Sequence, residues 1–131
     1  MSSNLTFSAN KDVFMGRHDS AQQQARSIDY HNQRYSDYIS RWKKGLESGM
    51  RGKTSISNNI RKYLFEKYDN KCSLCKWTAI NPTTGKVPLE VEHIDGNYLN
   101  NSEDNLTLLC PNCHSLTSTY KSLNAGQGRP R

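Results

Sequence analysis

The stretch LEVEHIDGNYLNN, residues 89–101, lies between two pairs of cysteines and decides the fold. Its first part alternates apolar and polar residues, which predicts a strand over residues 87–94. Glu92 and His93 stand side by side at the end of this run. The polar, asparagine-rich part that follows predicts a turn. A carboxylate and an imidazole are therefore expected where an ordered strand gives way to a loop.

Two CxxC pairs frame this stretch. Cys72 and Cys75 form the pair CSLC, and Cys110 and Cys113 form the pair CPNC. Cysteines spaced in this way place two thiolates of one turn at the separation that zinc needs, and a second such turn completes a tetrahedral shell. The spacing therefore predicts a closed, structural zinc site with four thiolate ligands. Disulfides or free thiols are the alternative.

Local signals predict the elements of residues 58–125. Ser57 has the character of an N-cap before a short helix, and LTLL, residues 106–109, predicts a second strand. Pro111 suits the first turn of a helix that runs to about Ser122. Zinc ligation by both cysteine pairs would draw the strands and this last helix together. We therefore expect a small α+β domain stapled by zinc.

The chain before this domain divides into an arm and a helical extension. Residues 1–17 are polar and aperiodic and indicate a flexible arm. Apolar residues spaced three and four apart predict an amphipathic helix from about residue 20 to residue 47. This helix either packs on the domain or pairs with a second copy of the chain. A glycine-rich linker is expected over residues 45–55, and residues 126–131 form a basic tail.

The composition excludes a large hydrophobic core. Of the 131 residues, 34% are hydrophobic, and the mean hydropathy is −0.89. A small domain with little core usually needs a disulfide or a structural metal. No segment approaches the roughly 20 apolar residues that span a bilayer, and the first residues do not resemble a signal peptide. We therefore expect a cytoplasmic protein without a membrane partner, in which paired cysteines bind metal.

The positive charge is concentrated before the cysteine-framed region. The net charge is +6, and residues 41–62 hold seven cations against one acid, Glu47. The seven cations, which we predict to contact DNA, are Arg41, Lys43, Lys44, Arg51, Lys53, Arg61 and Lys62. A dense basic block favours a polyanionic partner, most simply nucleic acid. A solubilising surface is the alternative. Residues 18–57 are thus predicted to be a helical DNA-binding extension with a basic linker.

The order of these features resembles the HNH endonuclease family of phages and bacteria, also called the ββα-metal nucleases. The residues that carry the resemblance are CSLC, LEVEHIDGN, EDNLTLLC and CPNCH. The resemblance implies a ββα-metal, treble-clef-like HNH nuclease domain over residues 58–125. It also implies metal-dependent hydrolysis of DNA phosphodiester bonds, by nicking or by double-strand cleavage. The products would carry 5′-phosphate and 3′-hydroxyl ends.

The resemblance further implies roles for four residues. His93 matches the general base, and Asn105 matches the middle asparagine, whose hypothesised task is to fasten the loop so that His93 points at the attacking water. His114 matches a ligand of the catalytic metal, and Glu92 stands where members of the family carry Asp or His as the other ligand. An imidazole suits proton transfer near neutral pH. The alternative for His114 is a substitute role at the zinc site.

The implied cofactors and partners follow from the same resemblance. They are a structural Zn²⁺, a catalytic Mg²⁺ or another divalent ion (Mn²⁺, Ni²⁺ or Zn²⁺), and double-stranded DNA. Arg129 and Arg131 of the tail would add contacts to phosphates. A homodimer, a phage DNA-processing partner and action in a bacterial cytoplasm or infected host cell are further expectations. A non-catalytic zinc-containing DNA-binding or adaptor protein is the competing hypothesis, and an RNA nuclease is a third.

Overall fold

The computed structural model describes residues 8–124, and the chain divides into two compact units, Met1–Asp37 and Tyr38–Arg131. Helix α1, Ser8–Lys43, forms the described part of the first unit, and its last residues belong to the second. No helix within the described range combines the length and the apolar character that crossing a membrane requires. The expected long helix before the cysteine-framed domain is thus present.

Helix α1 begins earlier than the sequence predicted. Its first residue is Ser8, so the flexible arm expected over residues 1–17 was wrong for residues 8–17. Gly16 lies inside the helix, since an isolated glycine costs a helix only about 1 kcal/mol. The remainder of the arm, residues 1–7, and the tail, residues 126–131, lie outside the described residues.

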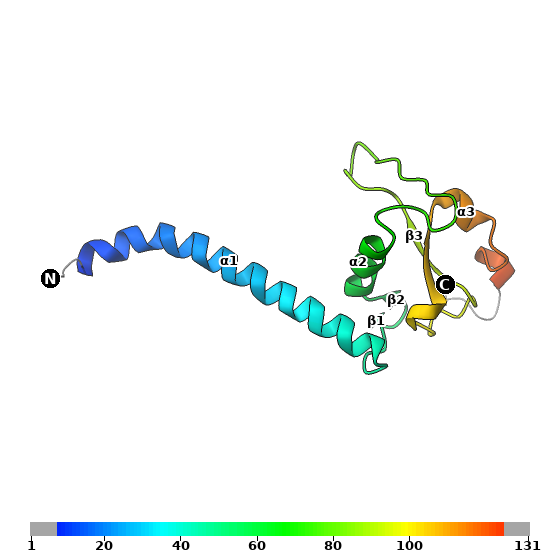
Figure 1. Ribbon diagram of the computed structural model, residues 1–131, viewed down its shortest axis with the longest axis horizontal. Helices are drawn as coiled ribbons and strands as arrows, with labels where there is room; N and C mark the ends of the chain where they lie inside the picture. Colours follow the sequence, from blue (N-terminus) through cyan, green and yellow to red (C-terminus); the bar gives the residue numbers. More distant parts are fainter. Residues whose placement is uncertain (1–7, 125–131) are drawn as a thin grey trace. The chain divides into compact units, whose positions relative to one another are not determined.

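The second unit is built on an antiparallel hairpin. Strands β3, Glu90–His93, and β4, Leu106–Leu109, pair with Glu92 opposite Thr107 and His93 opposite Leu106. The second strand is confirmed at its expected bounds, whereas the first starts later than residue 87. Pro88 precedes β3, and a proline cannot donate a hydrogen bond to a strand ladder. Figure 1 shows the hairpin between helices α2 and α3.

Helix α2, Asn58–Lys67, covers the side of the hairpin formed by β4. Ser57 caps it as predicted, because the Ser57 side chain accepts a hydrogen bond of 3.1 Å from the Asn59 amide. Ile60 and Leu64, one turn apart, are both fully buried. They contribute to a core in which Leu106, Leu108 and Leu109 are also buried. The apolar side of α2 therefore packs into the core of the second unit.

The end of α1 is anchored to the same unit. Trp42 is only 4% exposed, and its Nε1 donates a hydrogen bond of 2.6 Å to the backbone oxygen of Asn101. Ile39 is buried as well, whereas Ile28 on the earlier part of the helix is 60% exposed. Of the two alternatives for the amphipathic helix, packing on the domain therefore applies to its last turns, which carry Ile39 and Trp42.

The segment expected as a plain linker contains a small hairpin. Strands β1, Met50–Arg51, and β2, Ser55–Ile56, pair antiparallel, so the linker expectation was wrong over these residues. Ile56 is buried, which gives the hairpin an apolar contact with the domain. Gly49 precedes it with a φ of 78°, and a Cβ there would lie 2.7 Å from Cβ of Asn101. A glycine is needed at this close approach.

The last helix is shorter than predicted. Helix α3, Pro111–Ser115, ends before Leu116 instead of reaching Ser122, and a single-turn 3₁₀ helix, η2, follows at Lys121–Asn124. The Thr117 hydroxyl donates a hydrogen bond of 2.9 Å to the backbone oxygen of His114. A side chain that satisfies a terminal carbonyl competes with continuation of the helix. The residues after α3 can therefore turn back toward β3.

Candidate active site and metal centres

The four cysteines form one compact cluster. Their sulfur atoms all lie within 4.8 Å of one another, although the two pairs come from opposite ends of the intervening hairpin. Each pair sits in a turn, and the second turn begins α3, where the Cys113 amide donates to the Cys110 sulfur at 3.3 Å. All four are free cysteines. The cluster has the composition predicted for the zinc site, Cys72, Cys75, Cys110 and Cys113, and its sulfur atoms are close enough together to hold one metal ion.

The electrostatics of this cluster favour a bound cation. Burial opposes ionisation of Cys72, but hydrogen bonds from the backbone amides of Cys75, Cys110 and Leu74 outweigh it and lower the pKa of Cys72 to about 6. The neighbouring sulfurs of Cys110 and Cys75 raise the pKa of Cys113 to about 12. Crowded thiolates repel one another unless a positive ion stands among them. The sulfur donors therefore suit a soft or borderline ion such as zinc.

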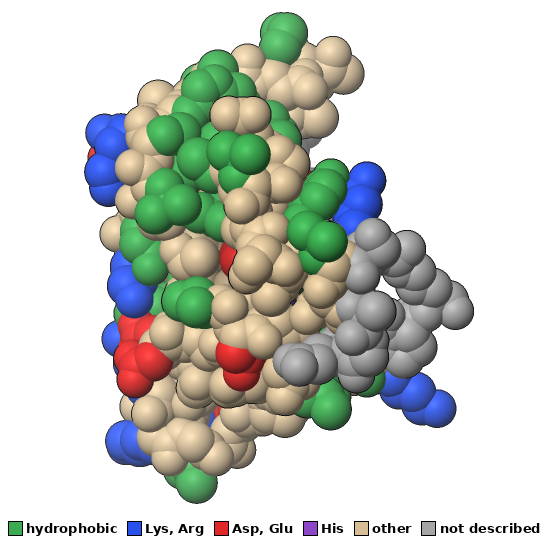
Figure 2. All heavy atoms as spheres, turned by 90° about the vertical axis from the view of Figure 1, so that its right-hand side faces the viewer, with side chains coloured by type: hydrophobic (Ala, Val, Ile, Leu, Met, Phe, Trp, Pro, Cys, Tyr) green, Lys and Arg blue, Asp and Glu red, His purple; other side chains and the backbone are tan. Residues whose placement is uncertain are grey.

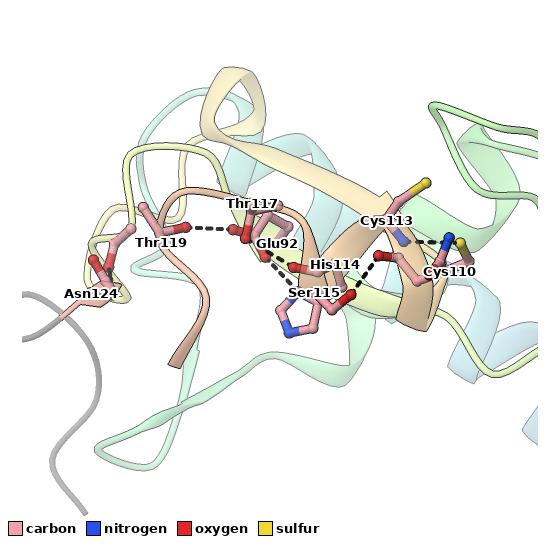
Figure 3. A network of polar contacts seen from close by, with 10 residues as sticks. Glu92, Cys110, Cys113, His114, Ser115, Thr117, Thr119 and Asn124 are labelled. Atoms are coloured by element: carbon pink, nitrogen blue, oxygen red, sulfur yellow. Dashed lines mark hydrogen bonds and ion pairs between the residues drawn. The ribbon is translucent and has the colours of Figure 1, made fainter. Parts of the chain in front are cut away.

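Glu92 and His114 meet at a second location. Nδ1 of His114 lies 2.7 Å from Oε1 of Glu92, and the Thr119 hydroxyl donates a hydrogen bond of 2.8 Å to Oε2. Glu92 is 7% exposed. Tyr120 sets its ring edge against the His114 ring, with centroids 5.1 Å apart. Figure 3 shows His114 and Thr119 approaching Glu92 from two sides, with the cysteines on the other side of His114.

This pair fits two neighbouring positions of a divalent ion. An octahedral ion with ligands at roughly 2.0–2.1 Å holds adjacent donor atoms about 2.9 Å apart. The 2.7 Å between the Glu92 oxygen and the His114 nitrogen is close to that separation, so an ion could replace the hydrogen bond after a small shift. Carboxylate and imidazole are ligands for Mg²⁺, Mn²⁺, Ni²⁺ and Zn²⁺. Within residues 8–124, the cysteine cluster is the one group of three or more such ligands, so this second ion would have two protein ligands.

His93 is held by a different partner. Its Nε2 lies 2.7 Å from Oδ1 of Asn101. Asn101 is buried, and its Nδ2 donates to the Ser48 backbone oxygen at 3.2 Å. The amide group is therefore oriented with its oxygen toward His93, which must then carry its proton on Nε2. The lone pair of a neutral His93 is left on Nδ1, where it can accept a proton.

Asn105 ties together the loop that follows β3. Its Nδ2 donates to Oδ1 of Asp95 at 2.9 Å and to the backbone oxygen of Asn100 at 2.8 Å. Its Oδ1 accepts from the Asp95 amide at 3.0 Å. The side-chain amide of Asn100, then the Asn97 backbone amide and Asn105, lower the pKa of Asp95. Asn105 therefore closes both ends of the loop over residues 95–100, directly after His93.

The contacts of the implied catalytic residues fall into two sets. His93 faces Asn101, whereas Glu92 faces His114 and Thr119, and in the described part of the chain these side-chain bonds share no partner. Adjacent strand residues point to opposite faces. The strand ends at His93, and a turn follows with Gly96 at a φ of 77°. Both Glu92 and His93 are still paired with β4, so the turn begins only after the two residues.

Sequence reasoning missed the two residues that complete these sets. Asn101 was interpreted as a turn former, since an Asn-rich loop carries no signal for a bond to His93. Thr119 was placed inside the expected helix 111–122 and received no role. The contact that it makes depends on α3 ending at Ser115.

The basic block is dispersed over several elements. Arg41 forms an ion pair of 2.9 Å with Glu47, and the Lys43 ammonium lies 4.6 Å from the Tyr63 ring centre. The others are exposed on the end of α1, the β1–β2 hairpin and α2; they are Lys44, Arg51, Lys53, Arg61 and Lys62. Arg61, Lys62 and Lys86 line an open groove of about 670 Å³ beside α2. On the face drawn in Figure 2, Lys and Arg side chains stand at separate places along both the left and the right edges, with Asp and Glu side chains among those on the left.

Comparisons with known proteins agree with this site. Residues 72–119 match the sequence model of the HNH endonuclease family. The chain is 61% identical over 41 residues to the H-N-H endonuclease F-TflIV of Escherichia phage T5, a match that covers 31% of this chain and 18% of that relative's length. No solved structure matches the chain. The matched residues 72–119 contain the four cysteines, Glu92, His93, Asn105 and His114, so this segment of the chain is similar to an HNH endonuclease domain.

Proposed function

We propose that this protein is a metal-dependent endonuclease that hydrolyses phosphodiester bonds in DNA. The observation that supports this most directly is the contact between Glu92 and His114, which pairs a carboxylate oxygen and an imidazole nitrogen at 2.7 Å within the HNH domain. Two protein ligands leave most positions of a divalent ion open to water and phosphate. A site with open positions suits hydrolysis, whereas the closed cysteine site suits a structural Zn²⁺.

His93 serves as the general base in this proposal. Asn101 accepts the Nε2 proton, so Nδ1 of His93 removes a proton from the water that attacks phosphorus. Asn105 fixes the loop that starts just after His93, and a fixed base reacts faster than a mobile one. Glu92 and His114 would hold Mg²⁺ or another divalent ion, which would supply positive charge for the phosphate and the leaving oxygen. The products carry 5′-phosphate and 3′-hydroxyl ends.

DNA is held by cations outside the metal sites. Residues 18–57 form a DNA-binding extension, and residues 58–125 form the nuclease domain. Lys44, Arg51, Lys53, Arg61 and Lys62 are exposed and contact phosphates without reading sequence. Arg41 and Lys43 are engaged with Glu47 and Tyr63, and contribute less. Arg129 and Arg131 lie outside the described residues. The protein acts inside a bacterial or infected host cell.

A cleavage assay on supercoiled plasmid tests the proposal. We expect the wild type to cleave in Mg²⁺ or Mn²⁺ and His93→Ala to lose cleavage by at least about 100-fold, while DNA binding persists. His31→Ala is the matched control, since His31 is exposed on α1 and contacts Ser27 of the same helix. Full cleavage by His93→Ala would remove the base assignment. A wild type that binds DNA but cleaves in none of the metals would support the adaptor hypothesis.

A further inference from the structure

Both oxygens of the Glu92 carboxylate have a polar partner, and the two partners come from different segments of the chain. Oε1 faces Nδ1 of His114 at 2.7 Å, and Oε2 accepts the hydrogen bond of 2.8 Å from Thr119. Glu92 is only 7% exposed, so both contacts of its carboxylate are made by protein groups. The Thr119 hydroxyl therefore fixes the rotation of the carboxylate about its last bond and turns Oε1 toward His114.

Thr119 belongs to a segment, residues 117–124, that is fastened beside the Glu92–His114 pair at several points. The Tyr120 ring packs edge-on against the His114 ring, and Nδ2 of Asn124 donates a hydrogen bond of 2.6 Å to the Gly96 backbone oxygen. A Cβ on Gly96 would lie 2.9 Å from Cγ2 of Thr119, so this segment sits directly on the turn that follows β3. Thr119 is consequently held in place by contacts that do not depend on Glu92.

Whether Oε2 of Glu92 is available as a second ligand atom affects which divalent ion the site prefers. Ca²⁺ takes six to eight oxygen ligands at roughly 2.3–2.6 Å and readily accepts both oxygens of one carboxylate. Mg²⁺ and similar small ions require near-octahedral geometry at roughly 2.0–2.1 Å, which one oxygen per carboxylate satisfies. A hydroxyl that occupies Oε2 therefore opposes two-oxygen binding and leaves a donor pair that suits the smaller ions.

We propose that Thr119 is a positioning residue that keeps Glu92 a one-oxygen ligand, and that it thereby makes the site prefer Mn²⁺ and Mg²⁺ over Ca²⁺. The inference rests on the proposed function, because it concerns the same divalent site. It adds a determinant of metal choice that lies outside the four residues of the HNH motif. Thr119→Val removes the hydroxyl at nearly constant volume, and Thr119→Ser keeps the hydroxyl while removing the methyl group.

The test is a calorimetric titration of the full-length, zinc-loaded protein with MnCl₂ and separately with CaCl₂, without DNA. We expect Thr119→Val to weaken Mn²⁺ binding roughly tenfold, the size typical of a lost partner of a metal ligand, and Ca²⁺ binding clearly less. The ratio of the two affinities should then fall. Thr119→Ser should keep the wild-type ratio. Thr78→Val is the matched control, because the Thr78 hydroxyl makes a bond of equal length, 2.8 Å, to the Asn70 backbone oxygen in the first cysteine turn.

Plasmid cleavage supplies a second readout. The Mn²⁺ concentration for half-maximal cleavage should rise in Thr119→Val, while the rate at saturating Mn²⁺ stays near that of the wild type. The role of Thr119 would be overturned if Thr119→Val kept the wild-type ratio of Mn²⁺ affinity to Ca²⁺ affinity. It would also be overturned if this ratio fell in Thr119→Ser. If Thr119→Val folds poorly, the ratio of Mn²⁺ affinity to Ca²⁺ affinity in Thr119→Ser still tests the role of Thr119. His114→Ala distinguishes the two proposals, since unchanged Mn²⁺ binding in that variant overturns the metal site and with it the proposed function.

Discussion

Nδ1 of His114 lies 2.7 Å from Oε1 of Glu92, across a sequence separation of 22 residues. Glu92 comes from β3 and His114 from the first turn of α3. The cysteine cluster sets this distance, because Cys110 and Cys113 begin the same helix and are gathered with Cys72 and Cys75. The cysteine cluster therefore helps to hold the helix that carries His114 beside the strand that carries Glu92.

Shortening the carboxylate should disconnect it from its partners. Glu92→Asp removes one methylene group, so its oxygens should no longer reach both His114 and Thr119. We expect Mn²⁺ affinity and plasmid cleavage to fall by roughly 10–100-fold, with the cysteine-bound zinc retained. Calorimetry and cleavage kinetics measure the two effects. Glu90→Gln, a change at an exposed carboxylate on the same strand, is the control, and an equal loss in both variants would argue against a specific role for Glu92.

Removal of the partner of His93 should affect chemistry more than metal binding. Asn101→Ala deletes the acceptor at 2.7 Å from Nε2, so His93 loses its fixed tautomer and orientation. We expect a fall in kcat of roughly tenfold or more, with Mn²⁺ affinity unchanged. The lost bonds to Ser48 and His93 should also lower the free energy of unfolding by about 1–2 kcal/mol. An unaltered kcat in a folded variant would contradict the assignment of Asn101.

Alanine substitutions at Gly96 and Gly85 distinguish the effect of backbone strain from the effect of a contact with Thr119, because the two glycines have the same backbone conformation. Gly96 and Gly85 have φ of 77° and 72°, but a Cβ would touch Thr119 and Asn124 only at Gly96 and meets nothing within 4 Å at Gly85. Backbone strain should cost each alanine variant about 1 kcal/mol of unfolding free energy, and Gly96→Ala should lose more because of its contacts. Gly96→Ala alone should also weaken Mn²⁺ binding, because residues 119–124 must move. Equal Mn²⁺ affinity in the two variants would refute this coupling.

The carboxylate of Glu103 should give stability that depends on pH. The hydrogen bond from Tyr63, and then the charges of Lys67 and Lys43, lower the pKa of Glu103 although burial opposes the shift. Since its pKa is lower in the folded state, ionised Glu103 stabilises the fold at neutral pH, and this contribution is lost as the pH falls through the lowered value. Glu103→Gln should cost about 1 kcal/mol at pH 7.

Urea unfolding of zinc-saturated protein measures this effect. The difference in unfolding free energy between wild type and Glu103→Gln should begin to shrink below about pH 5. Asp104→Asn, at an exposed neighbouring carboxylate, is the control, and an equal cost at pH 7 in both variants would argue against a specific role for Glu103. A difference that grows in acid would contradict the lowered pKa.

Removal of the cysteine-bound ion should unfold the HNH domain. The thiolates would repel one another without the cation, and binding of a structural metal contributes directly to folding. We expect a thiol-compatible zinc chelator to abolish the protected amides of β3 and β4 in hydrogen exchange. Restoration of zinc, but not of Mg²⁺, should recover them. Persistent protection after complete chelation would show that the hairpin does not depend on the ion.

The sequence predicted the elements whose signals are local. The two CxxC turns, the Ser57 cap and LTLL depend on spacing and side-chain type within a few residues, and all are confirmed in their positions. The errors concern where elements begin and end. Helix α1 begins at Ser8 rather than near residue 20, a small hairpin forms within the expected linker, and α3 ends early where Thr117 bonds the His114 carbonyl.

The residues of the candidate site also divide into those that the sequence predicted and those that it did not. A recognisable order of residues points to Glu92, His93, Asn105 and His114. The partners of these residues, Asn101 and Thr119, are ordinary polar side chains whose importance comes only from where the folded chain places them. Their contacts span 8 and 27 residues of sequence, and no pattern in the sequence specifies such a pairing.

Anomalous diffraction from crystals soaked in MnCl₂ tests the central claim most directly. The account predicts a manganese peak about 2.1–2.2 Å from Oε1 of Glu92 and from the His114 ring, separate from a zinc peak among the four cysteine sulfurs. It also predicts that the manganese peak disappears in His114→Ala while the zinc peak stays. Manganese bound elsewhere, with Glu92 and His114 still joined by their hydrogen bond, would contradict the account.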